Sequence, residues 1–394
     1  MVELLFDDNA LNLPSTLNDA WQSTKTFALA TTHSGVTKSW ILETLARLPE
    51  QFREHHFILL TSGSTGRPKM VIGSKKRAED LTRLLHQMQN AEPVTEAIGV
   101  LPLTYCYAFV NQWLWARVHN RRLVMTSGFA DIDKLQNTLR LANAAQLCLV
   151  KTHAPLLKTY FPVASFPGVI RLHFAGSRFP QEHLQYLHQL FPSAQIYNNY
   201  GCTEAMPRLC LRKAEEAETA DIVGKPLPGV TLHTDEKGDL LFRSPFGAVG
   251  FIDEEGVHLI TPDDWVPTGD QGILDDQGWC HVLGRSGEVF KRHGEKVSLS
   301  LLLQTLSNVW TGQASFYFEK DAQGEKAHVM VLSPHPSKEQ TRKILLNFRQ
   351  QHARAQWPLR LESVDSFPLL SNAKIDAEKL ARLDQKIVHW YHHV

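Results

Sequence analysis

The chain has 394 residues, its 41 Lys and Arg residues balance 41 Asp and Glu residues, and 43% of its residues are hydrophobic. One hydrophobic core seldom serves so long a chain, so we expect two domains. The neutral balance argues against bulk nucleic-acid binding, which needs a basic excess, and no apolar run of about 18 residues predicts a membrane span.

The N-terminus and the cysteines point to the cytoplasm. Asp7 and Asp8 stand where a signal peptide needs a basic region. The five cysteines form no CxxC pair, so we expect neither a disulfide framework nor a zinc site and interpret them as reduced and mostly buried. His389, His392 and His393 have the spacing of a metal site on a helix, although a solvated helix end is the commoner reason for such a pattern.

A phosphate-binding loop is the first strong motif along the chain. It follows a strand-like start, a helical stretch near Lys38–Leu48 and the apolar run 57–60. Glycine lets a backbone approach phosphate oxygens, and tight-turn N–H groups, hydroxyl groups and a lysine all bind anions. The loop therefore predicts a polyphosphate site formed by Thr61, Ser62, Gly63, Ser64, Thr65, Gly66 and Lys69.

This loop differs from a Walker A loop, which opens a helix. Arg67 and Pro68 precede the lysine, and the strand-favouring residues 70–72 follow it. The prediction is a strand, a loop and a second strand, with a flexible surface turn rich in Ser and Gly as the alternative.

Helix-like and strand-like patterns alternate from residue 77 to residue 190. Leu81, Leu84, Leu85 and Met88 form the apolar stripe of a helix predicted over 77–90. The other predictions are strands over 97–101, 122–125, 146–150 and 169–174, and helices over 132–142 and 181–190. Such alternation predicts an α/β layer with parallel strands.

The pattern changes to short strands after residue 224. Acidic turns at Asp235–Gly238, Asp253–Gly256 and Asp275–Gly278 predict hairpins, so a small β-subdomain is expected over about 224–283. The predicted domains are an α/β core over 1–284 that includes this subdomain, a hinge over 285–287, and a small mobile α+β domain over 288–394.

Ordered motifs along the chain resemble those of the adenylate-forming superfamily, which includes acyl-CoA synthetases, non-ribosomal peptide adenylation domains and luciferases. Thr61–Lys69 resembles the signature loop, and Tyr200–Glu204 resembles the Y-G-x-T-E motif. The other matching segments are Leu101–Tyr105, Ala175–Ser177, Val223–Gly229, Trp265–Asp270 with Gly284–Arg285, and Pro368 with Lys374. The loop comes early for this family, so the resemblance implies a member with a truncated first subdomain.

The resemblance implies a reaction in two steps. A carboxylate attacks the α-phosphorus of ATP, giving acyl-AMP and pyrophosphate, and the thiol of CoA or of a phosphopantetheinyl carrier protein then attacks the acyl carbonyl. The first step brings two anions together, so it needs cations where charge develops. By resemblance, Lys374 bridges the carboxylate and the α-phosphate, Glu204 is a Mg²⁺ ligand and Thr203 stands beside it. An exposed lysine in a turn and an acid at a helix N-terminus are the structural alternatives.

The resemblance also assigns residues to the nucleoside. Asp270 would accept hydrogen bonds from the ribose hydroxyls, and Arg285 would contact the ribose or the phosphates. Tyr200 would stack on adenine, although a core tyrosine is the rival interpretation. The other residues assigned to adenine and ribose are Gly176, Ser177, Asn199 and Gly201.

The acyl pocket decides which acid is activated. Relatives that activate amino acids carry an aspartate in the segment matching 101–109, and this chain has no acid there. A buried ammonium without a partner is costly, so an α-amino acid is disfavoured, and an aliphatic, aryl or β-keto acid is favoured. The predicted pocket residues are Tyr105, Tyr107, Phe109, Asn198 and Met206, each of which could instead be ordinary core.

The thiol step implies a C-terminal domain that rotates about a hinge. Gly287 stands at a hinge position that is usually charged in the family, and Gly294 matches the glycine of the pantetheine tunnel. Lys291, Arg292 and Lys296 either meet the phosphates of CoA or an acidic carrier protein, or form a solvated basic face.

The expected function is therefore an acid–thiol ligase that uses ATP and Mg²⁺, takes a small-molecule carboxylic acid, and loads CoA or an acyl carrier protein. Two alternatives stay open: an enzyme that makes acyl-AMP or transfers an acyl group without full ligase turnover, and a non-catalytic or regulatory member that binds acyl or pantetheinyl groups. The joint presence of Lys69, Glu204, Asp270, Arg285 and Lys374 argues against the second alternative.

Overall fold

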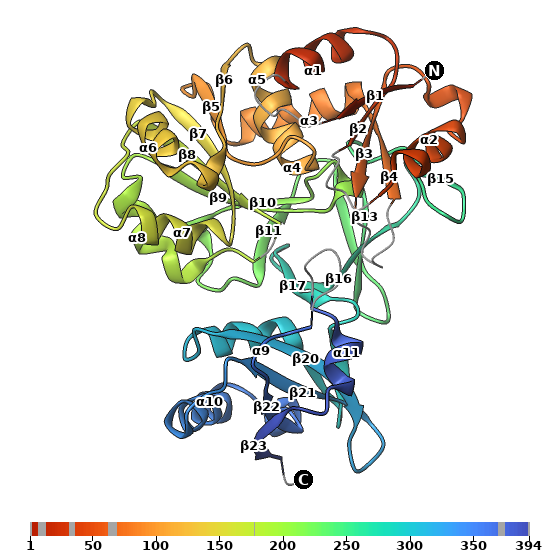
Figure 1. The fold of residues 1–394 in the computed structure, drawn as a ribbon. Helices are drawn as coiled ribbons and strands as arrows, with labels where there is room; N and C mark the ends of the chain where they lie inside the picture. The colour runs from red at the N-terminus through yellow and green to blue at the C-terminus, as the bar shows by residue number, and fades with distance from the viewer. Residues whose placement is uncertain are drawn as a thin grey trace. The chain divides into compact units, whose positions relative to one another are not determined.

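The computed structural model describes residues 2–6, 13–30, 36–61, 69–176, 178–368 and 375–392. The chain divides into two compact units (Figure 1). The first comprises Met1–Thr268 with Ile273–Val282, and the second comprises Gly269–Gly272 with Leu283–Val394. This division lies a few residues before the predicted hinge at 285–287, whose role as a hinge stays a prediction.

A six-stranded sheet in the first unit contains the two strands that flank the phosphate loop. Its order is β1 (Glu3–Phe6), β2 (Phe27–Ala30), β3 (His56–Thr61), β4 (Lys69–Ser74), β14 (Gly250–Ile252) and β15 (Val257–Leu259). Strands β3 and β4 are antiparallel, with Thr61 opposite Lys69, so the two strands predicted to flank the loop are confirmed. The helices of this segment are α1 (Leu13–Gln22) and α2 (Lys38–Ala46), together with the short 3₁₀ turn η1 (Glu50–Phe52).

The second sheet has eleven strands. Their order is β12 (Thr231–Thr234), β13 (Asp239–Arg243), β16 (Val266–Leu274), β17 (Cys280–Arg285), β11 (Ile222–Pro226), β10 (Cys210–Lys213), β9 (Gln195–Tyr200), β8 (Val169–Ala175), β7 (Ala145–Val150), β5 (Glu96–Gly99) and β6 (Arg122–Met125). The stretch from β6 to β9 is parallel, as the helix–strand alternation predicts. This arrangement confirms the predicted α/β class.

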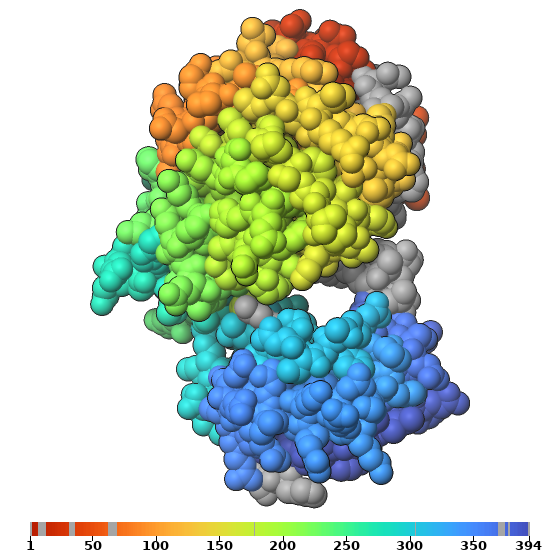
Figure 2. All heavy atoms as spheres, turned by 90° about the vertical axis from the view of Figure 1, so that its left-hand side faces the viewer, coloured from red at the N-terminus to blue at the C-terminus, as the bar shows by residue number. Residues whose placement is uncertain are grey.

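Helices cover both faces of the parallel strands. One apolar cluster includes α6 (Ile132–Leu141), α7 (His153–Tyr160) and α8 (Leu184–Leu190), and these yellow and green segments form much of the surface in Figure 2. A second cluster includes α3 (Lys75–Met88), where Ala78, Leu81 and Leu85 are buried. The remaining short helical elements are α4 (Cys106–Ala108), the π-helical turn η2 (Phe109–Leu114), α5 (Trp115–Val118), and the 3₁₀ turns η3 (Gly128–Ala130), η4 (Gln181–His183), η5 (Thr203–Ala205) and η6 (Ala214–Glu216).

The hairpins expected after residue 224 are present, and they divide between the two sheets. Strands β12 and β13, and β16 and β17, belong to the eleven-stranded sheet. The hairpin of β14 and β15 instead pairs with β4, where Phe251 lies opposite Val71. The phosphate-loop hairpin thus gains a neighbouring strand, β14, from a segment far along the chain.

The second unit is built on its own core. A hairpin of β18 (Val289–Arg292) and β19 (Glu295–Ser298) precedes a four-stranded sheet in the order β20 (Gln313–Lys320), β21 (Lys326–Ser333), β22 (Arg360–Ser363) and β23 (Ile387–Tyr391). The helical elements are α9 (Leu299–Ser307), α10 (Lys338–Gln351), η7 (Arg354–Gln356) and α11 (Ala377–Arg382). None of the helices in the described ranges combines the length and apolarity that crossing a membrane requires.

The helix end expected around the C-terminal histidines is wrong, because residues 387–391 form strand β23. Trp390 lies opposite Leu361 of β22 and packs against the core of the second unit. His389 lies 2.6 Å from the Ser363 hydroxyl, and His393 lies outside the described residues. A strand pairs through its backbone and alternates its side chains, which a histidine count does not reveal.

Candidate active site

The phosphate loop begins and ends at neighbouring backbone positions. Thr61 closes β3 and Lys69 opens β4, and the two are partners in the hairpin register. Ser62, Gly63, Ser64, Thr65 and Gly66 lie outside the described residues.

The Lys69 ammonium forms an ion pair with the Glu204 carboxylate. Both side chains are largely buried, at 21% and 14% exposed, and the ammonium also lies 5.0 Å from the centre of the Phe251 ring. The structure therefore brings together the ends of two sequence motifs that are far apart along the chain.

Strand β14 explains why Glu204 lies beside the phosphate hairpin. The Ala248 N–H donates to the Glu204 carbonyl at 2.8 Å, and the next N–H, of Val249, donates to Ile72 of β4 at 2.9 Å. Consecutive residues ahead of β14 thus connect the Glu204 turn to β4 by backbone hydrogen bonds. These backbone hydrogen bonds hold the Glu204 turn close enough to β4 for the ion pair to form.

The turn after β9 is tight and requires glycine at Gly201. A Cβ atom added there would lie 2.0 Å from the Pro207 carbonyl oxygen and 3.1 Å from the Arg208 Cα. Thr203 and Glu204 lie in the 3₁₀ turn η5, where the Thr203 carbonyl accepts from the Met206 N–H at 3.1 Å. The chain therefore doubles back sharply and holds Glu204 in a fixed position.

Residues predicted for adenine lie at the carboxyl ends of neighbouring parallel strands. Gly176 follows β8 with φ +81°, and Tyr200 ends β9 in a half-buried position. The buried Asn199 amide donates to the Phe174 carbonyl at 3.1 Å, while its Oδ1 has no hydrogen-bond partner among the described residues. Ligands of α/β sheets bind at this edge, so the placement fits a nucleotide. Ser177 lies outside the described residues.

The predicted ribose residues meet in the second unit. The Arg285 guanidinium lies 3.3 Å from the Asp270 carboxylate, which is 13% exposed, whereas the arginine side chain is 55% exposed. The two residues thus lie together, and their contact with a ribose stays a prediction.

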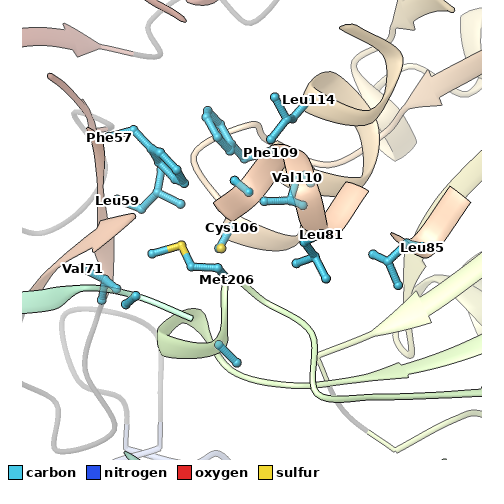
Figure 3. Packing of buried hydrophobic residues seen from close by; sticks show 14 of the residues in the cluster. Phe57, Leu59, Val71, Leu81, Leu85, Cys106, Phe109, Val110, Leu114 and Met206 are labelled. Atoms are coloured by element: carbon cyan, nitrogen blue, oxygen red, sulfur yellow. The ribbon is translucent and has the colours of Figure 1, made fainter. Parts of the chain in front are cut away.

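The predicted acyl-pocket residues differ in burial. Tyr105 is exposed at 61%, and Tyr107 is half-buried with a buried hydroxyl. Phe109 and Met206 lie in the main core, where the Phe109 ring is 5.1 Å from the Phe57 ring (Figure 3). The buried Asn198 amide donates to the Val223 carbonyl at 3.3 Å. Their contact with an acid stays a prediction.

The residues predicted for the thiol step lie in the second unit. Gly294 has φ +82° and follows His293 with φ +49°, so the pair forms the two-residue turn of the β18–β19 hairpin. A Cβ added to Gly287 or to Gly294 would meet nothing within 4 Å. Lys374 lies outside the described residues.

The expectation that Arg292 meets phosphates or belongs to a solvated face is wrong. Its side chain is 1% exposed, and its Nε donates to the equally buried Asp321 carboxylate at 3.1 Å. Alternation along β18 turns Arg292 inward and leaves Lys291 exposed. An aspartate inside a neighbouring turn cannot be recognised as its partner from the sequence.

Sequence reasoning missed Arg208, which follows the Glu204 turn. The side chain is 1% exposed, and its Nη2 donates to Asn111 Oδ1 at 2.8 Å. Burial lowers the pKa of Arg208 to about 10. Arginine is usually exposed, so only the sequence position, four residues after Glu204, could have drawn attention to it.

The described residues contain no cluster of three or more His, Cys, Asp or Glu side chains that could hold a metal ion. Glu204 nevertheless suits Mg²⁺, because that ion takes one or two carboxylates together with substrate phosphates and water. The carboxylate lies at the end of the phosphate hairpin, paired with Lys69, so it could serve as the protein ligand of a metal that arrives with a nucleotide.

All five cysteines are free, and four of them are buried, as predicted. Burial, together with the Glu204 carboxylate, raises the pKa of the Cys106 thiol, so this group is a neutral part of the core.

A model of the AMP-binding enzyme family matches residues 11–251, which is more than half of the chain. The chain belongs to the AMP-binding enzyme family. This finding confirms the resemblance to adenylate-forming enzymes.

Curated relatives of this family member are ligases and synthetases. The chain is 23% identical to a D-alanine–D-alanyl carrier protein ligase of Streptococcus pneumoniae, over 84% of this chain and 71% of the ligase. It is 26% identical to a malonate–CoA ligase of Arabidopsis thaliana, over 63% of this chain and 45% of the ligase. It is 23% identical to a delta-poly-L-ornithine synthetase of Acinetobacter baumannii, over 82% of this chain, and spans about a quarter (26%) of that synthetase.

Solved structures of similar fold include ligand complexes. The o-succinylbenzoate CoA synthetase of Bacillus subtilis bound to its acyl-adenylate intermediate aligns with a TM-score of 0.79 at 16% identity, covering 97% of this chain and 88% of the synthetase. The same synthetase with ATP and magnesium aligns with a TM-score of 0.69 at 18% identity, over 82% of this chain and 69% of the other. These alignments confirm the fold, including the separate small C-terminal unit.

Proposed function

We propose that this chain activates a carboxylic acid with ATP to acyl-AMP and pyrophosphate, and then transfers the acyl group to the thiol of CoA or of a phosphopantetheinyl carrier protein. The observation that carries the proposal is the ion pair of Lys69 with Glu204 at the base of the phosphate hairpin. Family membership and the ligase relatives support the same reaction class.

The ion pair has a direct chemical use. When a nucleotide binds, the Lys69 ammonium exchanges its carboxylate partner for phosphate oxygens, and the Glu204 carboxylate becomes available to a metal. Mg²⁺ held by Glu204 would neutralise phosphate charge during attack at the α-phosphorus. The two residues are thus already in place in the free protein, and each would exchange the other for a new partner: Lys69 for the phosphates and Glu204 for the metal.

The remaining roles complete the reaction. Asp270, paired with Arg285, accepts the ribose hydroxyls, and Tyr200 and Gly176 frame the adenine at the end of the parallel strands. Lys374 supplies the cation that brings the substrate carboxylate to the α-phosphate. Gly287 serves the rotation that precedes the thiol step, and Gly294 lies along the path of the pantetheine arm.

The substrate is an acid without an α-ammonium group. The described segment from Leu101 to Phe109 offers no carboxylate, although the D-alanine ligase is among the relatives. The five free cysteines fit a reducing compartment, so we place the reaction in the cytoplasm.

The test is pyrophosphate release from ATP and Mg²⁺ over a panel of aliphatic, aryl, β-keto and amino acids, with and without CoA. We expect release with one class of non-amino acids and AMP formation that increases with added thiol. Release confined to amino acids would overturn the substrate assignment. Absence of release with every acid, while ATP still binds, would favour a non-catalytic member.

A further inference from the structure

Arg208 is a buried arginine without a carboxylate partner. It is 1% exposed, and in the described part of the chain no acid lies within ion-pair distance of its guanidinium. Nη2 donates to Asn111 Oδ1 at 2.8 Å, and Nη1 is buried without a hydrogen-bond partner. A buried charge of this kind is costly unless something compensates it.

Two other buried arginines of the protein have different partners. Arg292 pairs with Asp321. Arg212, four residues after Arg208 and also 1% exposed, donates to three carbonyls: from Nε to Ile222 at 2.7 Å, and from Nη1 to Lys213 at 3.0 Å and Ala214 at 2.8 Å. Arg212 also leaves one nitrogen, Nη2, buried without a partner among the described residues. Arg208 therefore differs in the number of its bonds: it donates to a single amide oxygen, whereas Arg212 donates to three carbonyls.

Further unused polar groups gather around Arg208. The Tyr107 hydroxyl and both polar atoms of the Gln112 amide are buried and have no hydrogen bond of normal geometry among the described residues. The hydroxyl borders the Cys148 thiol and the Leu149 backbone, and the amide borders the same thiol. Burial raises the pKa of Cys148 to about 12, so this thiol is neutral and does not compensate the guanidinium. Neutral groups therefore surround the charge.

Arg208 lies between the two segments that the motifs connect with the acid. Its Cα borders Gly201 of the Glu204 turn, and its guanidinium carbon lies 5.9 Å from the centre of the Tyr107 ring. Tyr107 is half-buried while its hydroxyl is enclosed, and the neighbouring Tyr105 is 61% exposed. The partly exposed Tyr107 thus lies beside the buried arginine.

We propose that Arg208 binds a second carboxylate of the acid substrate, remote from the carboxylate that is activated, so that the substrate is a dicarboxylic acid. This inference rests on the proposed function. A guanidinium nitrogen, a tyrosine hydroxyl and an amide N–H₂ are all donors and suit a carboxylate, which only accepts. The same charge repels an ammonium, in keeping with the absence of an acid between residues 101 and 109.

The experiment compares the wild type with Arg208→Met, Arg208→Lys and the control Arg212→Met. Straight-chain dicarboxylic acids from malonate to suberate are each paired with the monocarboxylic acid of equal length. Binding is measured as the thermal shift without ATP, and turnover is measured as pyrophosphate release. We expect the wild type to be stabilised by one or two neighbouring diacids and not by their monoacid partners.

Arg208→Met should lower kcat/KM for that diacid about 100-fold or more, relax the preference over the monoacid, and leave the unfolding temperature without ligand unchanged or higher. Arg208→Lys should retain part of the preference, and Arg212→Met should retain all of it.

Two results overturn the inference: equal shifts with diacids and monoacids, or loss of stability in Arg208→Met with the substrate preference intact. Diacid-specific shifts without pyrophosphate release would support the inference and contradict the proposed ligase reaction. Turnover that prefers monoacids in both wild type and Arg208→Met would support the reaction and contradict the inference.

Discussion

Glu204→Gln separates the two roles proposed for this carboxylate. Gln keeps the shape and removes the charge, so the variant loses the ion pair with Lys69 and the proposed magnesium ligand together. An ion pair of this kind gains about 4 kcal/mol at an effective dielectric constant near 20. The side chains are mostly but not fully buried, so desolvation leaves a net value of about 1–2 kcal/mol.

The stability assay is thermal or urea unfolding without nucleotide, where we expect this loss to lower the unfolding temperature by a few degrees. The coupling with Lys69→Gln in a double-mutant cycle should recover a similar energy. The matched control is Glu96→Gln, which removes another buried carboxylate, 3.4 Å from Arg122 and far from the phosphate hairpin in sequence.

The magnesium assay is pyrophosphate release as a function of Mg²⁺ concentration. Since disturbing the support of a metal ligand costs 10–100-fold in metal affinity, removing a ligand should raise the Mg²⁺ concentration at half-maximal rate about tenfold or more. Glu96→Gln should leave this concentration unchanged. A wild-type Mg²⁺ dependence in Glu204→Gln would refute the metal-ligand role, even if stability falls as calculated.

Three further predictions concern other parts of the chain. Lys374→Ala should abolish adenylate formation and leave thioester formation from supplied acyl-AMP largely intact; equal loss of both steps would contradict its role. Gly201→Ala places a Cβ 2.0 Å from a backbone carbonyl oxygen and should cost about 2–3 kcal/mol in urea unfolding, whereas Gly287→Ala, with open space, should cost less than 1 kcal/mol. Burial lowers the pKa of His281, but hydrogen bonds to the two aspartates that flank it, at 3.0 and 3.2 Å, outweigh burial and raise that pKa. Its protonated form therefore stabilises the fold below the ordinary histidine pKa of about 6.5, and this contribution is lost as pH rises through the raised value. In urea unfolding, the wild-type midpoint should therefore fall as pH rises through this range, and His281→Asn should make the fall smaller. An unchanged pH profile in the variant would argue against a stabilising protonated His281.

Local patterns predicted the elements but not every partner of a strand. The strand-favouring residues 70–72 predict the strand after the phosphate loop, and the turn at Asp253–Gly256 predicts a hairpin; both are confirmed. Nothing local indicates that β14 pairs with β4, because that pairing depends on backbone groups distant in sequence. This non-local pairing is what brings Glu204 to Lys69.

The candidate site shows the same division. Motif order predicted that the phosphate loop and the Y-G-x-T-E turn serve one substrate, and the structure joins Lys69 with Glu204. Burial was harder to predict, because arginine side chains are mostly exposed in proteins, and yet Arg292 and Arg208 are 1% exposed. The residues next to each arginine in the sequence do not reveal whether it forms an ion pair with a buried acid, as Arg292 does, or has no acid partner in the described structure, as is the case for Arg208.

The segment from Glu204 to Arg208 therefore contains two charged side chains in different situations. Glu204 is compensated by Lys69 in the free protein, so a nucleotide must displace an existing partner. Arg208 has no acid partner in the described structure, so a dicarboxylic substrate would supply one rather than displace one. Binding energy from the remote carboxylate would then be available to position the reacting carboxylate beside ATP. A monoacid would leave the guanidinium without a negative partner. The preference for the diacid over the monoacid should therefore be seen in kcat/KM.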